Sequence, residues 1–347
     1  MKCRRFFTAM IIAMLLILPT ASIAEQARIQ KEDGRVLFDV PVISAPESMK
    51  SYSAEYMKFD VEAIKNAFLG DAEFTESITP ESEKNKYAMY NYASDQATLD
   101  IVDQISVSYE TNHSLFISQL LSSSEVYPEN ELSFMSKQEA AELCLNTIQP
   151  IFGECMVDKV YSLDADTLRS ISDAQREELQ EWADIGKEIW LKDDWSQADE
   201  CYYLKLKPII DGVAYTSESY VDQASDTSYI GCNIEAIVTQ NGIESFELYN
   251  MPQIIEIYEE QAILSQDAAM KIYADSMNNI LGDSKKTIDG MMLELTPVYE
   301  PGYHFSERFR VIPAWILKQK VVAVGPEGEI VGHRNILIDA ITGEKLV

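Results

Sequence analysis

Two stretches of this chain begin in the same way. Phe134–Ala141 reads FMSKQEAA and Ile263–Met270 reads ILSQDAAM, and in each the serine is followed 17 residues later by a glycine, Gly153 or Gly282. A serine hydroxyl accepts hydrogen bonds from the free amides of a first helical turn, and glycine adopts the left-handed conformation that ends a helix. The spacing therefore predicts two helices of equal length, each beginning at the serine and ending at the glycine.

The first of these helices also carries a capping box, because Glu139 stands three residues after Ser136. The second copy has Ala268 at the corresponding position, so only the serine cap remains. Few residues are identical between the copies. A true duplication and a coincidence of two ordinary capped helices both remain open.

Alternating apolar and polar residues predict antiparallel strands after each helix. The segments are Tyr203–Pro208, Cys232–Thr239 and Ile243–Leu248 after the first helix, and Met291–Tyr299, Phe309–Leu317 and Ile336–Ala340 after the second. The predicted fold class is therefore α+β, with tandem modules that each pack one helix on an antiparallel sheet.

The remaining divisions follow from this pair of modules. The first module spans 131–258 and carries an inserted helix within about 162–200, and the second module spans 259–347. Residues 55–130 read as a small α+β unit with a helix from Asp60 to Leu69, a strand from Leu99 to Tyr109, and Leu115–Leu121 returning beside that strand. Residues 25–54 read as an extended lead-in, and residues 1–24 as a signal peptide.

The signal-peptide prediction rests on the basic residues Lys2, Arg4 and Arg5, followed by the uncharged run Phe6–Leu18. Small residues then precede an expected cleavage between Ala24 and Glu25. An uncleaved anchor is the alternative, but the apolar run covers only roughly 20 Å of a hydrocarbon layer about 30 Å thick. We therefore expect a secreted or extracytoplasmic protein of the cell envelope, without a stable membrane span after cleavage.

The charge of the chain restricts its partners. The sequence has 57 acidic and 28 basic residues, a formal net charge of -29. Nucleic acids and anionic lipid surfaces are disfavoured, because binding to either depends on Lys and Arg. Four cysteines follow the signal segment, and two disulfides or four free thiols are both open: Cys144, Cys155, Cys201 and Cys232.

The end of the chain resembles a known module. Ile338–Leu346 reads IDAITGEKL, and a helix opening with Ser-x-x-x-Ala-Ala precedes the strands. This pattern resembles the PepSY-type module of exported bacterial proteins, clearly over Leu264–Val347 and more weakly from Met135 to about residue 250. Two such modules behind a signal are similar to exported Gram-positive proteins of unknown function and, more remotely, to the YycH and YycI regulators. The resemblance implies inhibition of peptidases or regulation of signalling proteins by binding, without catalytic residues.

No catalytic, metal or cofactor motif stands out. The histidines His113, His304 and His333 lack the spaced partners of a zinc site, and there is neither a nucleophile elbow nor a phosphate-binding glycine loop. We therefore expect no cofactor. With 57 acids, a carboxylate pair suited to glycan or peptide hydrolysis stays open, so an exported hydrolase is the alternative function.

Two groups of residues are candidates for partner binding. The inserted helix, expected from Asp173 to Trp190, carries Trp182 and Trp190 on its apolar face. The predicted strand around Phe309 carries four cations on its other face: Arg308, Arg310, Lys318 and Lys320. The competing interpretations are packing of the tryptophans within the module and pairing of the cations with nearby acids. The sequence thus favours a non-catalytic exported binding or regulatory protein whose partner is a protein or peptide of the envelope.

Overall fold

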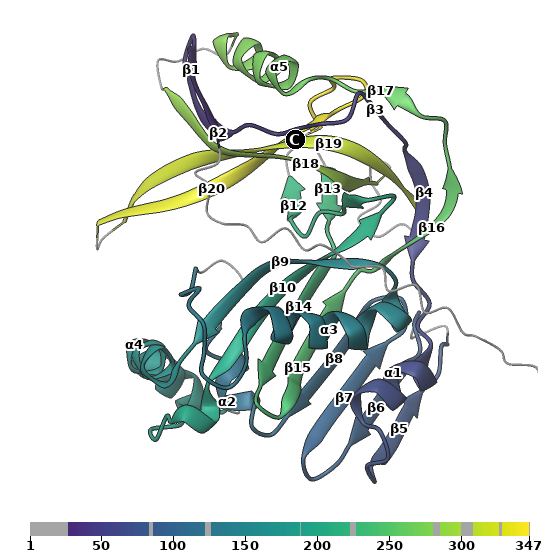
Figure 1. Cartoon of the computed structure of the whole chain (residues 1–347), viewed down its shortest axis with the longest axis vertical. Coiled ribbons are helices and arrows are strands. Elements are labelled where there is room, and N and C mark those ends of the chain that lie inside the picture. The colour runs from purple at the N-terminus through teal and green to yellow at the C-terminus, as the bar shows by residue number, and fades with distance from the viewer. Residues whose placement is uncertain are drawn as a thin grey trace, which may run out of the picture.

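The computed structural model describes residues 27–82, 86–121, 126–187, 189–222, 227–279, 285–299, 308–325 and 328–346. Two β-sheets form two lobes, one above the other (Figure 1). The expected signal peptide lies outside the described residues. Among the residues that are described, no helix is both long and apolar enough to cross a membrane.

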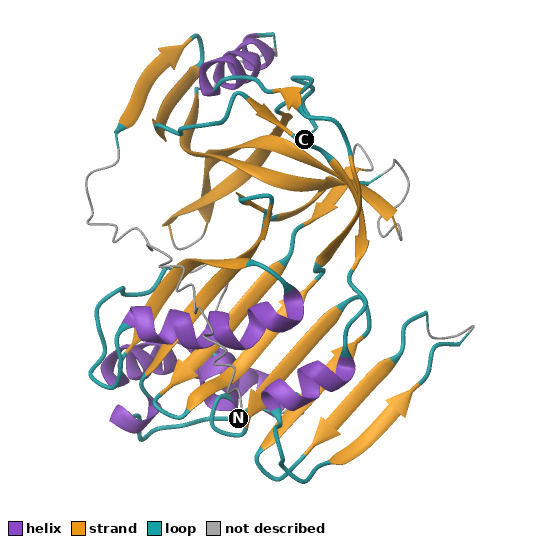
Figure 2. Ribbon diagram, turned by 45° about the vertical axis from the view of Figure 1, so that its right-hand side comes forward, coloured by secondary structure: helices purple, strands orange, loops and turns teal. Residues whose placement is uncertain are grey.

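The lower lobe is built on a nine-stranded sheet whose neighbours are all antiparallel. Its strands are β5 (Thr75–Thr79), β6 (Met89–Ala93), β7 (Ala97–Val102), β8 (Ser106–Thr111), β9 (Cys155–Leu163), β10 (Cys201–Ile210), β11 (Val213–Ala214), β14 (Asn233–Thr239) and β15 (Gly242–Tyr249). The helices α1 (Val61–Phe68) and α3 (Lys137–Phe152) cross one face of this sheet, as Figure 2 shows.

The α3 helix forms where the repeat predicts it. The Ser136 hydroxyl accepts from the amide of Glu139, and the Glu139 carboxylate accepts from the amide of Ser136, so the predicted capping box is present. Gly153 ends the helix with a φ of 87°. The buried face of α3, which includes Cys144 and Ile148, packs with strand residues into the largest hydrophobic core.

A second, smaller core lies on the other face of the nine-stranded sheet, at one end. There α2 (Leu115–Ser118) and α4 (Ala165–Asp184) pack against Tyr203 and Ile237. Trp195, just before the 3-10 turn η1 (Gln197–Asp199), belongs to the same core. Both faces of the sheet are therefore covered at this end, by different helices.

The upper lobe is built on a seven-stranded sheet. Its strands are β1 (Arg28–Asp33), β2 (Val36–Pro41), β4 (Tyr52–Tyr56), β16 (Pro252–Ile257), β18 (Lys286–Val298), β19 (Arg308–Gly325) and β20 (Gly328–Asp339). All pairs are antiparallel except β2 with β18. The helix α5 (Gln266–Asn278) covers one face around Trp315, with Ser265 as its cap, and the predicted terminal Gly282 lies outside the described residues.

Four short strands complete the upper lobe. Strand β3 (Ser48–Met49) pairs with β17 (Gln261–Ala262), and β12 (Ser219–Asp222) pairs with β13 (Thr227–Ile230). The last of these pairs lies between the two large sheets (Figure 1).

The predicted fold class is confirmed, since each repeat helix packs on a sheet whose strand pairs are mainly antiparallel. Two local predictions are wrong. The segment Leu99–Tyr109 is a hairpin of two strands, because it turns at Asp103–Ile105, and Leu115–Ser118 is a short helix rather than a returning strand.

The segments expected before the first module contribute strands to both sheets. Residues from the 25–54 segment supply β1 to β3 and the first part of β4, and buried Val36, Phe38 and Val40 alternate along β2. Residues from the 55–130 segment supply β5 to β8, which continue the nine-stranded sheet through the pairing of β8 with β15. The order of strands in space thus differs from the order of the segments in the chain.

Candidate functional site

A cleft lies between the two sheets, on the face of the nine-stranded sheet that α1 and α3 do not cover. Its volume is about 620 Å³, and most of its lining is polar: Asp158, Lys159, Tyr161, Lys205, Lys207, Ser217, Glu218, Ser219, Asn233, Glu235 and Lys318, with the apolar Val126 and Met292. A smaller hollow of about 300 Å³ shares Asn233 and Glu235 and extends to Glu247. We call the two together the groove.

The floor of the groove is a row of polar side chains that the strand register places next to one another. Across β8, β15, β14, β10 and β9 the direct partners are Ser108, Glu247, Glu235, Lys205 and Lys159. Direct cross-strand partners project from the same face of a sheet. Their neighbours along each strand, such as Leu204 and Phe246, point into the core beneath α3.

The centre of the floor is held in place by hydrogen bonds and aromatic rings. The Tyr203 hydroxyl donates to Glu235 at 2.6 Å, and the Asn233 amide donates to the same carboxylate at 3.2 Å. The Nζ of Lys205 lies 5.6 Å from the ring of Tyr203 and 5.8 Å from the ring of Tyr161. These contacts fix side chains of both charges along one surface.

Partial burial shifts the ionisation of the floor. Burial raises the pKa of Glu247, and the neighbouring Glu235 and Glu110 carboxylates raise it further. Burial also lowers the pKa of Lys205, against the attraction of Glu235. Each shift favours the neutral form, and an oppositely charged group of a bound ligand would move each pKa back toward its ordinary value.

The upper wall of the groove comes from the other sheet. Lys207 on β10 makes an ion pair of 2.7 Å with Glu294 on β18 and lies 3.6 Å from Asp158. Lys318 on β19 makes an ion pair of 2.8 Å with Glu218, whose other oxygen accepts from Asn335 at 3.0 Å. The Lys207–Glu294 pair therefore ties the two sheets together at the groove, and Glu218, just before β12, is held against β19 and β20.

This arrangement is suited to binding. Glu235 and Glu247 rise side by side from neighbouring strands of one floor, whereas the paired carboxylates of glycosidases flank the bond from two sides. Within the described ranges, no group of three His, Cys, Asp or Glu side chains is arranged to hold a metal ion. The groove offers a long polar surface with fixed charges.

Of the four predicted cations, the structure places only Lys318 at the groove. Arg308 is exposed and makes an ion pair of 3.1 Å with Glu256, and Arg310 is exposed opposite Ser53. Lys320 is exposed opposite His333. Ten residues of β19 separate Arg308 from Lys318, about 30 Å of extended strand, so the cations do not form one patch.

The inserted helix begins earlier and ends earlier than predicted. It spans Ala165–Asp184 with Asp164 as its cap, and Gly186 follows with a φ of 85°. Trp182 lies on the helix and is 39% exposed, with Lys187 Nζ 4.3 Å above its ring. Trp190 lies beyond the helix and is half-buried, and its amide donates to Gln119. The two tryptophans therefore do not share a helix face.

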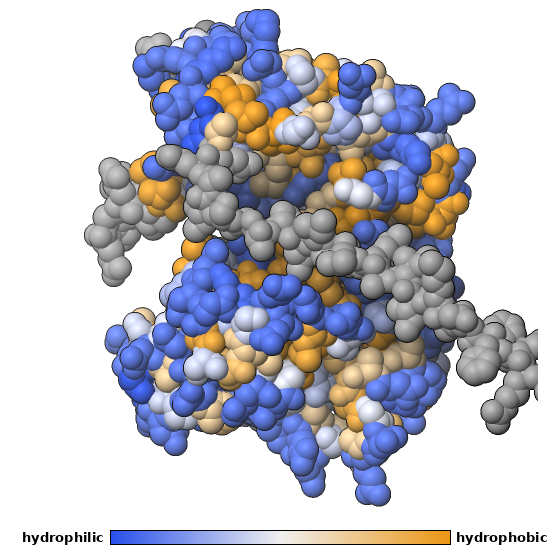
Figure 3. Space-filling model, in the orientation of Figure 1, coloured by the Kyte–Doolittle hydropathy of each residue, from blue (hydrophilic) through white to orange (hydrophobic). Residues whose placement is uncertain are grey.

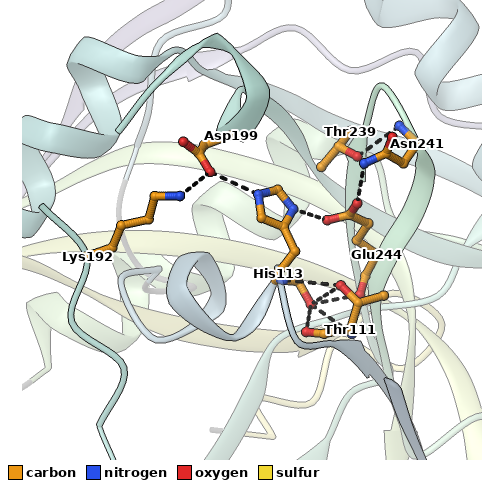
Figure 4. A network of polar contacts seen from close by, with 8 residues as sticks. Thr111, His113, Lys192, Asp199, Thr239, Asn241 and Glu244 are labelled. Carbon is orange, nitrogen blue, oxygen red and sulfur yellow. Dashed lines mark hydrogen bonds and ion pairs between the residues drawn. The ribbon is translucent and has the colours of Figure 1, made fainter. Parts of the chain in front are cut away.

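His113 is the centre of a network that the sequence did not predict (Figure 4). Its Nδ1 contacts Glu244 on β15, and its Nε2 lies 2.9 Å from Asp199, which also accepts from Lys192 at 2.7 Å. The hydrogen bond to Glu244 is the main cause that raises the pKa of His113 to about 9. The network fastens the segment after α4 to β15 and to the turn that follows β8, two strands in the middle of the sheet. Its partners are 86 and 131 residues from His113, so no local pattern could have indicated it.

The sequence left open whether the four cysteines form disulfides, and the structure shows their state. Cys144, Cys155, Cys201 and Cys232 are all buried and free. Burial raises the pKa of the Cys144 and Cys155 thiols to about 12, which makes them inert near neutral pH.

Comparison with known proteins identifies the fold but no family. The chain is similar to the crystal structure of an uncharacterised protein from Eubacterium rectale, with a TM-score of 0.67 and 17% sequence identity over 92% of both chains. The Bacillus megaterium YpeB C-terminal domain aligns with a TM-score of 0.35 and 9% identity over 82% of this chain and 93% of that domain. No family model and no curated protein matches the sequence.

Proposed function

We propose that this protein is a non-catalytic exported binding or regulatory protein, which holds an extended polypeptide segment of the cell envelope in the groove. The observation that carries this proposal is the row of charged side chains on the groove floor, in which two neighbouring glutamates are followed by two neighbouring lysines. Inhibition of a peptidase and modulation of an envelope signalling protein are the two regulatory roles that fit such binding.

The dimensions of the floor favour an extended peptide. Neighbouring strands lie about 4.8 Å apart, so the row from Ser108 to Lys159 is about 19 Å long. An extended chain covers that length with about six residues. A peptide with acidic and basic side chains would meet Lys205 and Lys159 toward one end and Glu235 and Glu247 toward the other.

The extracytoplasmic location and the PepSY-like type are parts of the same proposal. The basic and apolar opening of the chain supports export, and the ending IDAITG supports the resemblance to the PepSY module. A binding protein without catalytic residues is consistent with export and with the resemblance to the PepSY module. The exported hydrolase is not favoured by any carboxylate arrangement among the residues that the structure covers.

The test measures whether the protein captures a polypeptide from the envelope or converts a peptide or glycan substrate. Wild-type protein and two variants are incubated with an envelope extract and, separately, with a panel of peptides and wall glycans. Asn233→Trp fills the centre of the groove, and Glu142→Lys, on the outer side of α3, is the matched control. We expect saturable capture by the wild type and by the control, loss of capture by Asn233→Trp, and no turnover by any of them. Turnover that disappears on replacing Glu235 or Glu247 would refute the proposal.

A further inference from the structure

Strands β1 and β16 lie at opposite ends of the strand order β1-β2-β18-β19-β4-β16, and these two edge strands are built differently. Strand β1, at one edge, reads RIQKED and carries both charges, with Arg28 in a 2.7 Å ion pair to Asp39. Charged side chains along an edge prevent a foreign strand from adding to the sheet. Strand β16, at the other end of this order, reads PQIIEI and carries one charged residue, Glu256, where β1 carries four.

The β16 edge exposes three large apolar residues close together. Ile255 is 41% exposed, Ile257 is 57% exposed, and Tyr258 directly after the strand is 37% exposed. Hydrophobic residues form a patch on the right-hand side of the upper lobe in Figure 3, where Figure 1 places β16. An edge strand protected against pairing carries charged residues, as β1 does. Exposed apolar residues on β16 instead indicate a surface that a partner can contact.

The backbone of β16 has a partner on one side only. In the part of the chain that the structure covers, β16 pairs with β4 and with no other strand. The register between β16 and β4 shifts between Ile254 and Glu256. Beyond this irregularity, Glu256 and Ile257 pair directly with Ser53 and Tyr52. The outward amide and carbonyl groups of the strand can therefore hydrogen-bond to an added strand.

The charge around this edge selects the kind of strand. Glu256, Glu259 and Glu260 are exposed next to the isoleucines, and Glu256 makes an ion pair of 3.1 Å with Arg308. Pairing with a second copy would bring two such acidic edges together in chains of net charge -29. A strand with Lys or Arg between its apolar residues would instead complement both the charge and the isoleucines.

We propose that β16 is a docking edge for an extended segment of a partner protein, in which apolar residues alternate with Lys or Arg and which adds to the sheet as a further strand. This edge is separate from the groove and binds by main-chain pairing. The partner segment places its apolar side chains over Ile255 and Ile257 and its cations near Glu259 and Glu260.

The probe is a fluorescein-labelled peptide of alternating valine and lysine, and an alternating alanine and lysine peptide of equal charge is the comparison. We expect saturable binding of the valine peptide by fluorescence anisotropy, and binding at least about tenfold weaker for the alanine peptide. The double variant Ile255→Lys/Ile257→Lys should weaken the valine peptide by about tenfold or more. Gln30→Lys on β1 and Glu142→Lys on α3, both at exposed positions, should leave its affinity unchanged.

Amide hydrogen exchange provides a measurement that needs no variant. Bound valine peptide should slow exchange of amides in β16 and leave those of β1 unchanged. Equal binding of the two peptides, or protection confined to other elements, would overturn the proposal. A wild-type dimer in sedimentation that Ile255→Lys/Ile257→Lys dissociates would also overturn it, since a second copy would then occupy the edge.

Discussion

The Nζ of Lys207 lies 2.7 Å from Oε1 of Glu294, and this contact joins the nine-stranded sheet to the seven-stranded sheet. Both side chains are less than a tenth exposed, and Asp158 lies 3.6 Å from the same ammonium. Burial alone would lower the pKa of Lys207, but Glu294 and Asp158 outweigh it and raise the pKa above its ordinary value. The lysine is therefore charged, and the pair fixes the width of the groove.

Removal of one partner should destabilise the protein strongly. Lys207→Met leaves the Glu294 carboxylate buried without its cation, and its Oε2 already has no hydrogen-bond partner in the described structure. We expect a loss of about 3–5 kcal/mol in the free energy of unfolding, measured with urea. The double variant Lys207→Met/Glu294→Leu should recover most of it.

The exposed pair of Lys50 and Asp211, at 2.8 Å, is the matched control. Because both side chains are more than two-fifths exposed, Lys50→Met should cost no more than about 1 kcal/mol. Equal costs for the two lysine variants would contradict the role given to Lys207.

Stability should depend on pH through His113. Its pKa is raised from 6.5 to about 9 in the folded protein, so its contribution is complete below pH 6.5 and is lost as the pH rises to about 9. His113→Asn should remove this dependence in urea titrations between pH 6 and pH 10. An unchanged alkaline slope in the variant would show that other groups cause it.

The acidic partners of His113 act at the other end of the pH scale. Hydrogen bonds from Lys192 and His113 outweigh burial and lower the pKa of Asp199 to about 2, and His113 similarly lowers the pKa of Glu244. Their contribution is present above the unfolded values near pH 4 and is lost as the pH falls through the folded values. Asp199→Asn should therefore flatten the acid limb of the stability curve.

The two repeat helices allow a direct comparison of caps. Ser136→Ala removes a capping box, and Ser265→Ala removes a single hydrogen bond from Ala268. Each change should cost about 1 kcal/mol, with the larger loss for Ser136, because Glu139 also loses a contact. Urea denaturation of both variants tests this order, and a larger loss for Ser265 would contradict it.

Trp182 and Leu179 on α4 should behave differently. Leu179 is 3% exposed, and Leu179→Ala should cost about 2–4 kcal/mol of stability. Trp182→Ala should cost less than about 1 kcal/mol, because the ring is exposed beside Lys187. If Trp182 contacts a partner, its variant will lose capture while its melting temperature stays near that of the wild type. Unfolding of this variant would instead show that the ring belongs to the core.

The buried thiols predict resistance to reagents and reductants. Cys144, Cys155, Cys201 and Cys232 should react with a thiol reagent only after unfolding, and dithiothreitol should leave the melting temperature unchanged. A fall in melting temperature on reduction would reveal a disulfide and contradict the free state.

The sequence predicted those parts of the fold that depend on local chemistry. The Ser136 cap, the Gly153 ending and the alternation in β10, β14 and β15 are each encoded within a few residues. The order of strands was not predictable in the same way. Pairing of β8 with β15 joins residues more than 130 positions apart, and burial of Val36 and Phe38 depends on the parallel contact of β2 with β18.

Less of the candidate site than of the fold could be predicted from the sequence. The polar residues of the groove floor were visible as the outward face of each predicted strand, but only the register brings Glu247, Glu235 and Lys205 into one row. The sequence indicated cations on one face of a single strand, but Arg308 and Lys318 are ten positions apart on the extended β19 and so lie far from each other. Convergence of several strands, rather than any single motif, builds the groove.

Site-specific photo-crosslinking tests most directly whether the groove holds a polypeptide without changing it. A benzophenone amino acid is placed at Asn233 in the groove or at Glu142 on the outer side of α3, and the protein is irradiated in an envelope preparation. Intact polypeptide joined to position 233, and none joined to position 142, is the expected result. Cleaved fragments whose formation requires Glu235 or Glu247, or equal crosslinking from both positions, would contradict a non-catalytic role for the groove.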